Sequence, residues 1–189
     1  DELPYKENMP LKAVYPYDVS KACSDMISLS YATTFDMPVA ITRCGNFFGG
    51  GDLNWNRVIP GTIRSVVRDQ APVIRSDGSL IRDYIYVEDA VSAYMTLTER
   101  LTLNPQLKGE AFNFSNESQK TVLELVNSIL TILGSNLQPI VQGNNHGEIQ
   151  AQYLDSSKAN QVLGCNLTFS LNEGLKKTVN WYTNYLEGL

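Results

Sequence analysis

The chain has 189 residues and a mass of 21.0 kDa, with 43% hydrophobic and 19% charged residues. This length and composition fit a globular protein of one large or two small domains with a real core. The formal net charge is −5, which argues against a nucleic-acid partner, because nucleic-acid-binding proteins carry a basic face.

Other features exclude further classes of protein. No apolar run approaches the roughly 20 residues of a membrane span, and the first residues lack the basic and apolar regions of a signal peptide. Cys23, Cys44 and Cys165 form no CxxC pair, so we expect small buried thiols in a reducing, cytoplasmic protein. His146, the one histidine, is expected to be solvated in a polar loop, and one histidine indicates no metal site.

Helix-like and strand-like segments alternate along the chain. Residues 1–16 are polar and contain three prolines, which indicates a loop. The expected helices have apolar residues at helical spacing and cover 17–35, 59–67, 88–101, 121–134, 156–163 and 170–186. The expected strands are short and contain β-branched or aromatic residues: 38–43, 72–74, 81–87, 111–115, 139–141 and 150–154. This alternation predicts an α/β layered fold.

Local signals mark one loop and two helix starts. Residues 45–51 are dense in glycine, which predicts a loop. Thr121 with Glu124, and Ser170 with Glu173, match the Ser/Thr-x-x-Glu pattern of a capping box. Each pair therefore predicts where a helix begins.

Tyr17 and Lys21 are the first candidates for chemistry. Residues four apart on a helix lie on one face, about 6 Å apart along the axis. An ammonium group held near a phenol favours the phenolate, which can take a proton from a sugar hydroxyl. The spacing alone also occurs by chance, so its meaning depends on the surrounding sequence.

Four blocks around this pair carry a specific pattern: 15–21 (YPYDVSK), 38–52 (PVAITRCGNFFGGGD), 82–89 (RDYIYVED) and 111–115 (AFNFS). Together they resemble the nucleotide-sugar enzymes of the extended short-chain dehydrogenase/reductase family, the NAD-dependent epimerases and dehydratases, over nearly the whole chain. Within that family, residues 49–64 are most similar to the branch that dehydrates CDP-glucose. Other branches usually have Gly-Pro at the position of the first two of these glycines.

One part of the family pattern is absent. The family begins with a strand and a Gly-x-x-Gly-x-x-Gly loop that holds the NAD pyrophosphate, whereas the glycines of 45–51 have another spacing and follow another strand. The resemblance therefore implies the C-terminal part of a longer enzyme. Residues 1–45 and 83–116 would be the remainder of a Rossmann-like, doubly wound NAD-binding domain. Residues 46–82 and 117–189 would form the small α/β domain that binds the nucleotide sugar.

The resemblance also implies roles for individual residues. Tyr17 would deprotonate the C4 hydroxyl of the sugar while hydride passes to NAD, and Lys21 would hold the nicotinamide ribose and favour the Tyr17 phenolate. The guanidinium fork of arginine suits a diphosphate. Four residues are expected to bind the sugar or its diphosphate: Asn46, Arg57, Arg82 and, as a weaker candidate, Arg64.

Several of these residues have structural alternatives. The alternative for Arg82 is a surface ion pair with Asp83 or Glu88, and the alternative for Asn46 is a turn. Asp83 itself is expected to be a structural cap. The aromatic residues within 181–185 have helical spacing, which favours a packing face over a ligand site.

The expected function is NAD-dependent dehydration of CDP-glucose to CDP-4-keto-6-deoxyglucose in deoxysugar and lipopolysaccharide biosynthesis. The resemblance implies a homodimer. The cysteines favour the cytoplasm, and the net charge and the lack of a long apolar run argue against nucleic-acid and membrane partners. Two alternatives stay open: another nucleotide-sugar dehydratase or 4-epimerase of the same family, and a non-catalytic nucleotide-sugar-binding fragment. The chain by itself is expected to be inactive, because it lacks the glycine loop.

Overall fold

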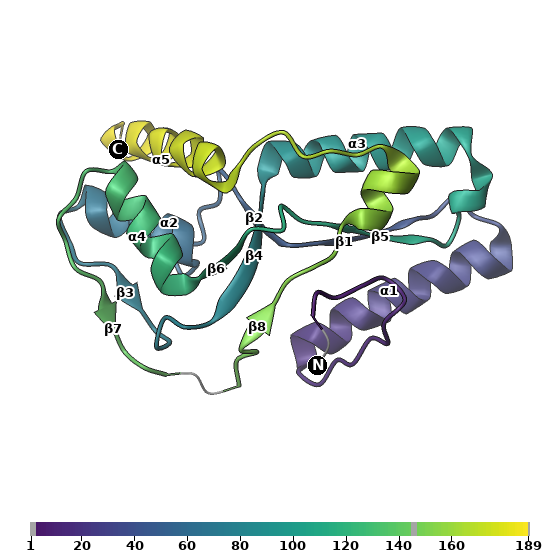
Figure 1. Cartoon of the computed structure of the whole chain (residues 1–189), viewed down its shortest axis with the longest axis horizontal. Helices are drawn as coiled ribbons and strands as arrows, with labels where there is room; N and C mark the ends of the chain where they lie inside the picture. The colour runs from purple at the N-terminus through teal and green to yellow at the C-terminus, as the bar shows by residue number, and fades with distance from the viewer. Residues whose placement is uncertain (1–2, 145–146, 189) are drawn as a thin grey trace.

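A computed structural model of the chain describes residues 3–144 and 147–188. It is an α/β fold of parallel sheets flanked by helices, as predicted (Figure 1). Within the described residues the α-helices are α1 (Pro16–Phe35), α2 (Val58–Val67), α3 (Val87–Leu103), α4 (Val122–Ile132) and α5 (Leu171–Glu187). Two short helical turns are η1 (Pro105–Leu107) and η2 (Ala159–Leu163).

The strands found within residues 3–144 and 147–188 pair in three small sheets. The strands are β1 (Ile41–Cys44), β2 (Asn46–Phe48), β3 (Val73–Ile74), β4 (Ile81–Tyr86), β5 (Ala111–Phe114), β6 (Gln119–Thr121), β7 (Ile140–Val141) and β8 (Ala151–Gln152). β1 pairs with β5 and β3 with β7, both in parallel. β4 is the central strand of the remaining sheet, parallel to β2 and β8 and antiparallel to β6.

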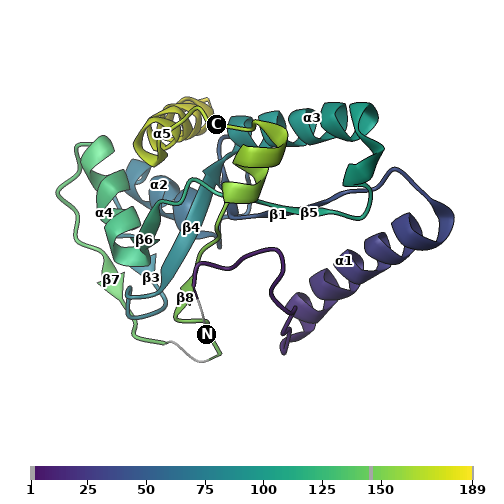
Figure 2. The same cartoon turned by 45° about the vertical axis from the view of Figure 1, so that its right-hand side comes forward.

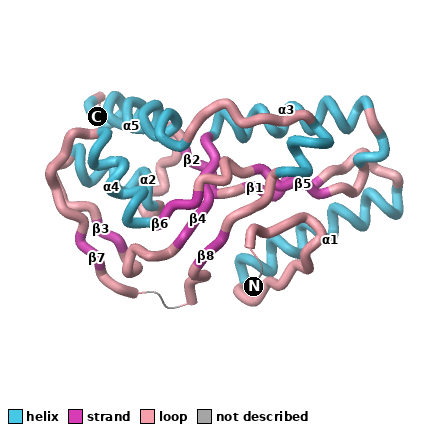
Figure 3. The backbone as a smooth tube through the Cα atoms, in the orientation of Figure 1, coloured by secondary structure: helices cyan, strands magenta, loops and turns pink. Residues whose placement is uncertain are grey.

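The helices cover these sheets from different sides. In Figures 1 and 2, α3 lies on one side of β1 and β5 and α1 lies on the other. The helices α2, α4 and α5 gather at the opposite end of the molecule, beyond β4. Figure 3 shows β1, β2, β4, β5 and β6 near the middle of the molecule, between these two groups of helices, and the β3–β7 pair at its left edge. The layered arrangement is that of a partial Rossmann-like domain.

Each group of helices has its own buried cluster. The first cluster joins α2, α4 and α5 around Phe48, Tyr84 and Tyr86, all at most 4% exposed. The second joins α3, β5 and η2 around Ile85 and Phe112, which are fully buried. β4 contributes to both clusters, because its alternate side chains point to opposite faces.

Both predicted capping boxes are confirmed. At the start of α4, the Thr121 hydroxyl accepts a hydrogen bond from the Glu124 amide at 3.1 Å, and the Glu124 carboxylate accepts one from the Thr121 amide at 2.9 Å. Ser170 and Glu173 make the same reciprocal pair at the start of α5. Such caps satisfy amide groups that the first turn of a helix leaves unpaired.

Three expectations need correction or fall outside the described residues. The loop predicted over 45–51 contains β2, because residues 46–48 pair with β4. Cys165 is buried as expected, but Cys44 is only partly buried and Cys23 is exposed, since among the residues of α1 only Ala32 is buried. His146 lies outside the described residues.

Among the residues described, no helix is long and apolar enough to cross a membrane.

Candidate active site

Tyr17 and Lys21 meet on the first turns of α1. Pro16 occupies the first helical position, where its fixed φ suits a helix start. The Lys21 ammonium lies 5.6 Å from the centre of the Tyr17 ring. The Tyr17 side chain is 70% exposed. The phenol and the ammonium are therefore adjacent and open to a ligand, as the four-residue spacing predicts.

Arg57 stands at the start of α2, beyond a short loop. The Asp52 carboxylate accepts hydrogen bonds from the Asn54 amide at 3.0 Å and from Nη1 of Arg57 at 2.9 Å. The Arg57 side chain is 62% exposed, whereas that of Asp52 is 23% exposed. The guanidinium is thus oriented by a carboxylate of its own loop while most of its surface faces solvent.

Arg64 lies two turns further along α2. Its guanidinium sits 4.8 Å from the centre of the Trp55 ring, in a cation–π contact. The Trp55 ring in turn packs edge-on against Tyr182 of α5, with ring centres 5.8 Å apart. Arg64 is therefore held on an aromatic surface beside the loop that carries Arg57.

Arg82 is already engaged by a neighbouring segment. Its guanidinium donates to the Ile149 carbonyl at 2.6 Å and to the Glu148 carboxylate at 3.0 Å, and only 14% of its side chain is exposed. The surface ion pair predicted as the alternative is wrong in its partners, because Arg82 pairs with Glu148 and Glu88 pairs with Lys177. No local pattern in the sequence connects Arg82 with a carboxylate 66 residues away.

Asp83, the next residue of β4, is a buried junction. One carboxylate oxygen accepts hydrogen bonds from the Ser115 hydroxyl and from the Leu154 amide, the latter at 3.1 Å. Its other oxygen is buried without a hydrogen-bond partner among the described residues. Burial raises the pKa of this carboxyl group, although the bonds from Ser115 and Leu154 act in the opposite direction. Asp83 thus ties three segments together from within β4. The expectation that it is a structural cap is therefore wrong, because it bonds to distant segments and not to the start of a helix.

Asn46 is the first residue of β2. It faces Tyr84 across the parallel pair with β4, and its side chain is exposed. The alternative interpretation of Asn46 as a turn residue is therefore wrong. Asn46 therefore lies two residues after the end of β1, on a strand that pairs with β4.

The predicted site residues come from different parts of the fold. Figure 1 shows α1, with Tyr17 and Lys21, on the right, and α2 at the far left. One contact links the surroundings of Arg82 to the start of α1: a methyl group on Gly147, the neighbour of Glu148, would lie 3.7 Å from the Tyr15 hydroxyl. The segment that contains Gly147 and Glu148, the latter paired with Arg82, therefore lies near Tyr15 at the start of α1.

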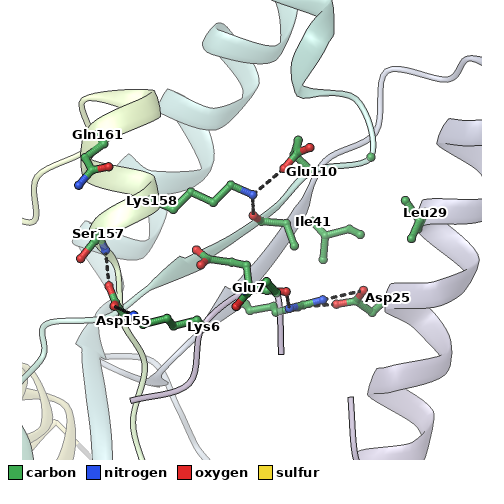
Figure 4. Close-up of a pocket in the computed structure, with 14 residues that line it drawn as sticks. Lys6, Glu7, Asp25, Leu29, Ile41, Glu110, Asp155, Ser157, Lys158 and Gln161 are labelled. Atoms are coloured by element: carbon green, nitrogen blue, oxygen red, sulfur yellow. Dashed lines mark hydrogen bonds and ion pairs between the residues drawn. The ribbon is translucent and has the colours of Figure 1, made fainter. Parts of the chain in front are cut away.

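A cavity lies elsewhere in the described residues, between α1 and the β1–β5 pair (Figure 4). It measures about 590 Å³, and none of the predicted site residues lines it. Charged groups in its wall pair with one another: Arg43 with Asp25 at 2.7 Å and Lys158 with Glu110 at 2.6 Å. These ion pairs link the elements that surround the cavity. Because these charged groups are already paired, we assign no ligand to the cavity.

Gly49 and Gly50 fit close packing rather than a cofactor cradle. A methyl group would lie 2.4 Å from the Val87 side chain at Gly49 and 2.4 Å from the Trp181 ring at Gly50. Glycine is needed at both positions because neighbouring side chains occupy the space. Of the residues expected to bind NAD, the described chain thus offers Tyr17 and Lys21 but no pyrophosphate loop in this segment.

Known proteins share this arrangement. A family model described as the NAD dependent epimerase/dehydratase family matches residues 1–114. A CDP-glucose 4,6-dehydratase of Salmonella typhimurium is 32% identical, over 97% of this chain and 54% of its own length. A dTDP-glucose 4,6-dehydratase of Haemophilus influenzae is 30% identical, over 94% of this chain and 54% of its own length.

Solved structures agree on the fold. The dTDP-glucose 4,6-dehydratase of Bacillus anthracis, in complex with NAD, superimposes with a TM-score of 0.84 at 28% identity, over 97% of this chain and 57% of that one. A UDP-glucuronic acid 4-epimerase of Bacillus cereus gives 0.85 at 23% identity, over 98% of this chain and 58% of that one, and shows the fold alone. The chain spans about half the length of the curated relatives it matches.

Proposed function

Because the chain belongs to the NAD-dependent epimerase/dehydratase family, we propose that the whole protein converts CDP-glucose to CDP-4-keto-6-deoxyglucose, for deoxysugars of lipopolysaccharide. The observation that carries the proposal is the Lys21 ammonium lying 5.6 Å from the exposed Tyr17 ring. The choice of substrate is supported by the 32% identity to a CDP-glucose 4,6-dehydratase. The domain division at 1–45 with 83–116, and at 46–82 with 117–189, is part of the same proposal.

In this mechanism Tyr17 is the base of the oxidation step. Its phenolate takes the proton of the C4 hydroxyl, so that a ketone forms at C4, and the nearby Lys21 ammonium stabilises the phenolate. Tyr17 and Lys21 would hold the nicotinamide ribose of NAD beside the sugar, where NAD would supply the acceptor for the C4 hydride and the donor for its return to C6. The C4 ketone acidifies the C5 hydrogen, and loss of that proton with the C6 hydroxyl removes one water and leaves a C5–C6 double bond. Return of the hydride to C6 is then balanced by a proton that is added at C5. The proposal assigns Tyr17 and Lys21 to the oxidation and leaves the elimination to other groups.

Substrate binding falls to the polar residues on the other elements. Asn46 would hydrogen-bond the sugar or its diphosphate. Arg57, whose guanidinium is oriented but 62% exposed, is the readiest phosphate ligand. Arg82 would join it when a phosphate takes the place of the Glu148 carboxylate, and Arg64 would add positive charge from α2.

A homodimer in the cytoplasm completes the proposal. The homodimer is supported by apolar side chains that α1 leaves more than half exposed: Met26, Ile27 and Phe35. A second copy of the chain would remove part of this surface from water.

Two alternatives have distinct outcomes. A 4-epimerase would use the same Tyr17 chemistry but would return the hydride to C4, with no change in mass. A non-catalytic nucleotide-sugar-binding protein would bind substrate without converting it, and binding would raise its melting temperature.

The test uses the full-length protein with NAD. It is incubated separately with CDP-, dTDP- and UDP-glucose and with GDP-mannose, and the mass of each nucleotide sugar is followed. Loss of one water from CDP-glucose alone is expected, and Tyr17→Phe should reduce this rate by about 10²- to 10⁴-fold, the usual contribution of a positioned base. Tyr31→Phe, on the same helix, is the matched control. Loss of water from another sugar, or epimerisation without loss of mass, would contradict the proposal.

A further inference from the structure

Tyr182 connects α5 to the loop that orients Arg57. Its side chain is fully buried, and its hydroxyl donates a hydrogen bond to the Asp52 carbonyl at 2.6 Å. The two residues are 130 positions apart in the sequence. A buried hydroxyl that donates to a loop carbonyl fixes the position of that peptide group.

The same aspartate orients the arginine. While its carbonyl is held by Tyr182, the Asp52 carboxylate accepts hydrogen bonds from the Asn54 amide and from Nη1 of Arg57 at 2.9 Å. The Arg57 amide donates back to the Asn54 carbonyl at 3.0 Å. The path from α5 to the guanidinium therefore runs through one residue, Asp52.

A second contact holds the loop from the other side. The Trp181 ring covers Gly50 so closely that a methyl group there would lie 2.4 Å from it. Trp181 is fixed in turn by the stacked ring of Tyr185, with ring centres 5.0 Å apart and an interplanar angle of 11°. The loop is thus held between two neighbouring aromatic residues of α5.

We propose that Tyr182 is a positioning residue for Arg57, holding Asp52 so that the guanidinium is presented to the diphosphate of the nucleotide sugar. This inference rests on the proposed function, in which Arg57 binds phosphate. If a flexible side chain such as that of Arg57 is already fixed, less conformational entropy is lost when the substrate binds. The contribution of Tyr182 therefore appears in the affinity for the substrate. Tyr182 does not touch the reacting atoms, and the chemical step does not depend on it.

The Tyr182 hydroxyl stays available as a donor over the working range of pH. Burial, with a smaller effect from the Asp52 carboxylate, raises the pKa of Tyr182 to about 12. The contribution of its hydrogen bond should therefore be the same across neutral pH.

The first test compares Tyr182→Phe with Tyr185→Phe in the full-length protein. Tyr182→Phe removes only the hydroxyl, and we expect the KM for CDP-glucose to rise about three- to tenfold, with kcat within about twofold of the wild type. Tyr185→Phe keeps its stack on Trp181 and should change neither constant. A fall in kcat without a change in KM would overturn the assignment.

A double-mutant cycle separates positioning from general destabilisation. Arg57→Ala should raise KM more than Tyr182→Phe does, and the double variant should be no worse than Arg57→Ala, because the hydroxyl acts through Arg57. Independent, additive effects would show a merely structural role and overturn the inference. If Tyr182→Phe does not fold, Asp52→Asn tests the second half of the path, in which the Asp52 carboxylate orients Arg57, and should raise KM to a similar extent. An unchanged KM in Asp52→Asn would overturn the inference.

The outcomes also distinguish this inference from the proposed function. An unchanged KM in Tyr182→Phe together with a raised KM in Arg57→Ala would overturn the positioning role alone. An unchanged KM for every nucleotide sugar in Arg57→Ala would overturn both the role of Arg57 and the inference built on it.

Discussion

Replacing the buried carboxylate of Asp83 by a methyl group is the most direct test of how the fold is held at its centre. Asp83→Ala deprives the Ser115 hydroxyl and the Leu154 amide of their shared acceptor. A hydrogen bond to a charged group contributes about 1.5 kcal/mol or more, so two such losses amount to about 3 kcal/mol. Burial of the charged carboxylate opposes part of this loss, which leaves an expected destabilisation of about 2 kcal/mol.

Asp83→Asn separates the hydrogen bonds from the charge. Both bonds in the wild type use one oxygen of Asp83, and the other oxygen has no partner among the described residues. The asparagine oxygen can therefore accept both bonds, with its amide group on the side of the unpartnered oxygen. At neutral pH we expect the free energy of unfolding of Asp83→Asn to lie within about 1 kcal/mol of the wild-type value.

The pH dependence follows from the raised pKa of Asp83. A carboxyl group with a raised pKa binds its proton more tightly in the folded state than in the unfolded state. The extra stability that the bound proton gives the folded state is complete below the pKa of an aspartate in the unfolded chain, about 3.9. This extra stability is lost as the pH rises through the raised pKa of Asp83 in the folded protein. Relative to Asp83→Asn, which does not titrate, the wild type should therefore lose stability over that range.

The assay is urea unfolding of the full-length protein, followed by tryptophan fluorescence at several pH values. Asp69→Asn, at an exposed aspartate, controls for the change in net charge. Equal destabilisation by Asp83→Asn and Asp83→Ala would refute the hydrogen-bond argument. A wild type that gains stability relative to Asp83→Asn as the pH rises would refute the argument from burial.

Two further predictions concern packing and capping. Gly50→Ala should destabilise the protein by about 1–3 kcal/mol, because its methyl group would lie 2.4 Å from the Trp181 ring. In a double variant, Trp181→Ala should remove this clash and relieve much of the loss, which unfolding measurements can check. Thr121→Ala should cost about 1 kcal/mol by removing one half of the capping box, whereas Thr131→Ala, on an exposed face of the same helix, should change the midpoint of thermal unfolding less.

The sequence predicts local features of this fold well. The capping pairs at Thr121 and Ser170 mark helix starts within one residue, because the signal and the structure lie in the same turn. The adjacency of Tyr17 and Lys21 is confirmed for the same reason, since helix geometry alone brings them together. The packing face expected at 181–185 is also confirmed, with Tyr182 buried and its two aromatic neighbours in ring contact.

Features that depend on distant segments were not predictable. The strand at 46–48 is hidden among glycines, which usually indicate a loop. Those glycines are required by Val87 and Trp181, far along the chain. The ion pair of Arg82 with Glu148 and the bond from Tyr182 to Asp52 likewise join residues 66 and 130 positions apart. No local periodicity records such contacts, because they arise only when the sheets and helices pack.

These distant contacts give the two proposed phosphate ligands different properties. The partner of Arg57 is a fixed carboxylate, since Asp52 is 23% exposed and Tyr182 holds its carbonyl. The partner of Arg82 is a side chain that is 51% exposed, and an ion pair with such a partner contributes only about 0–1 kcal/mol. A diphosphate carries more charge than a carboxylate and offers more acceptor oxygens, so it can replace Glu148 at small cost. Arg57 would thus meet the ligand already oriented, and Arg82 would change partners when the ligand binds.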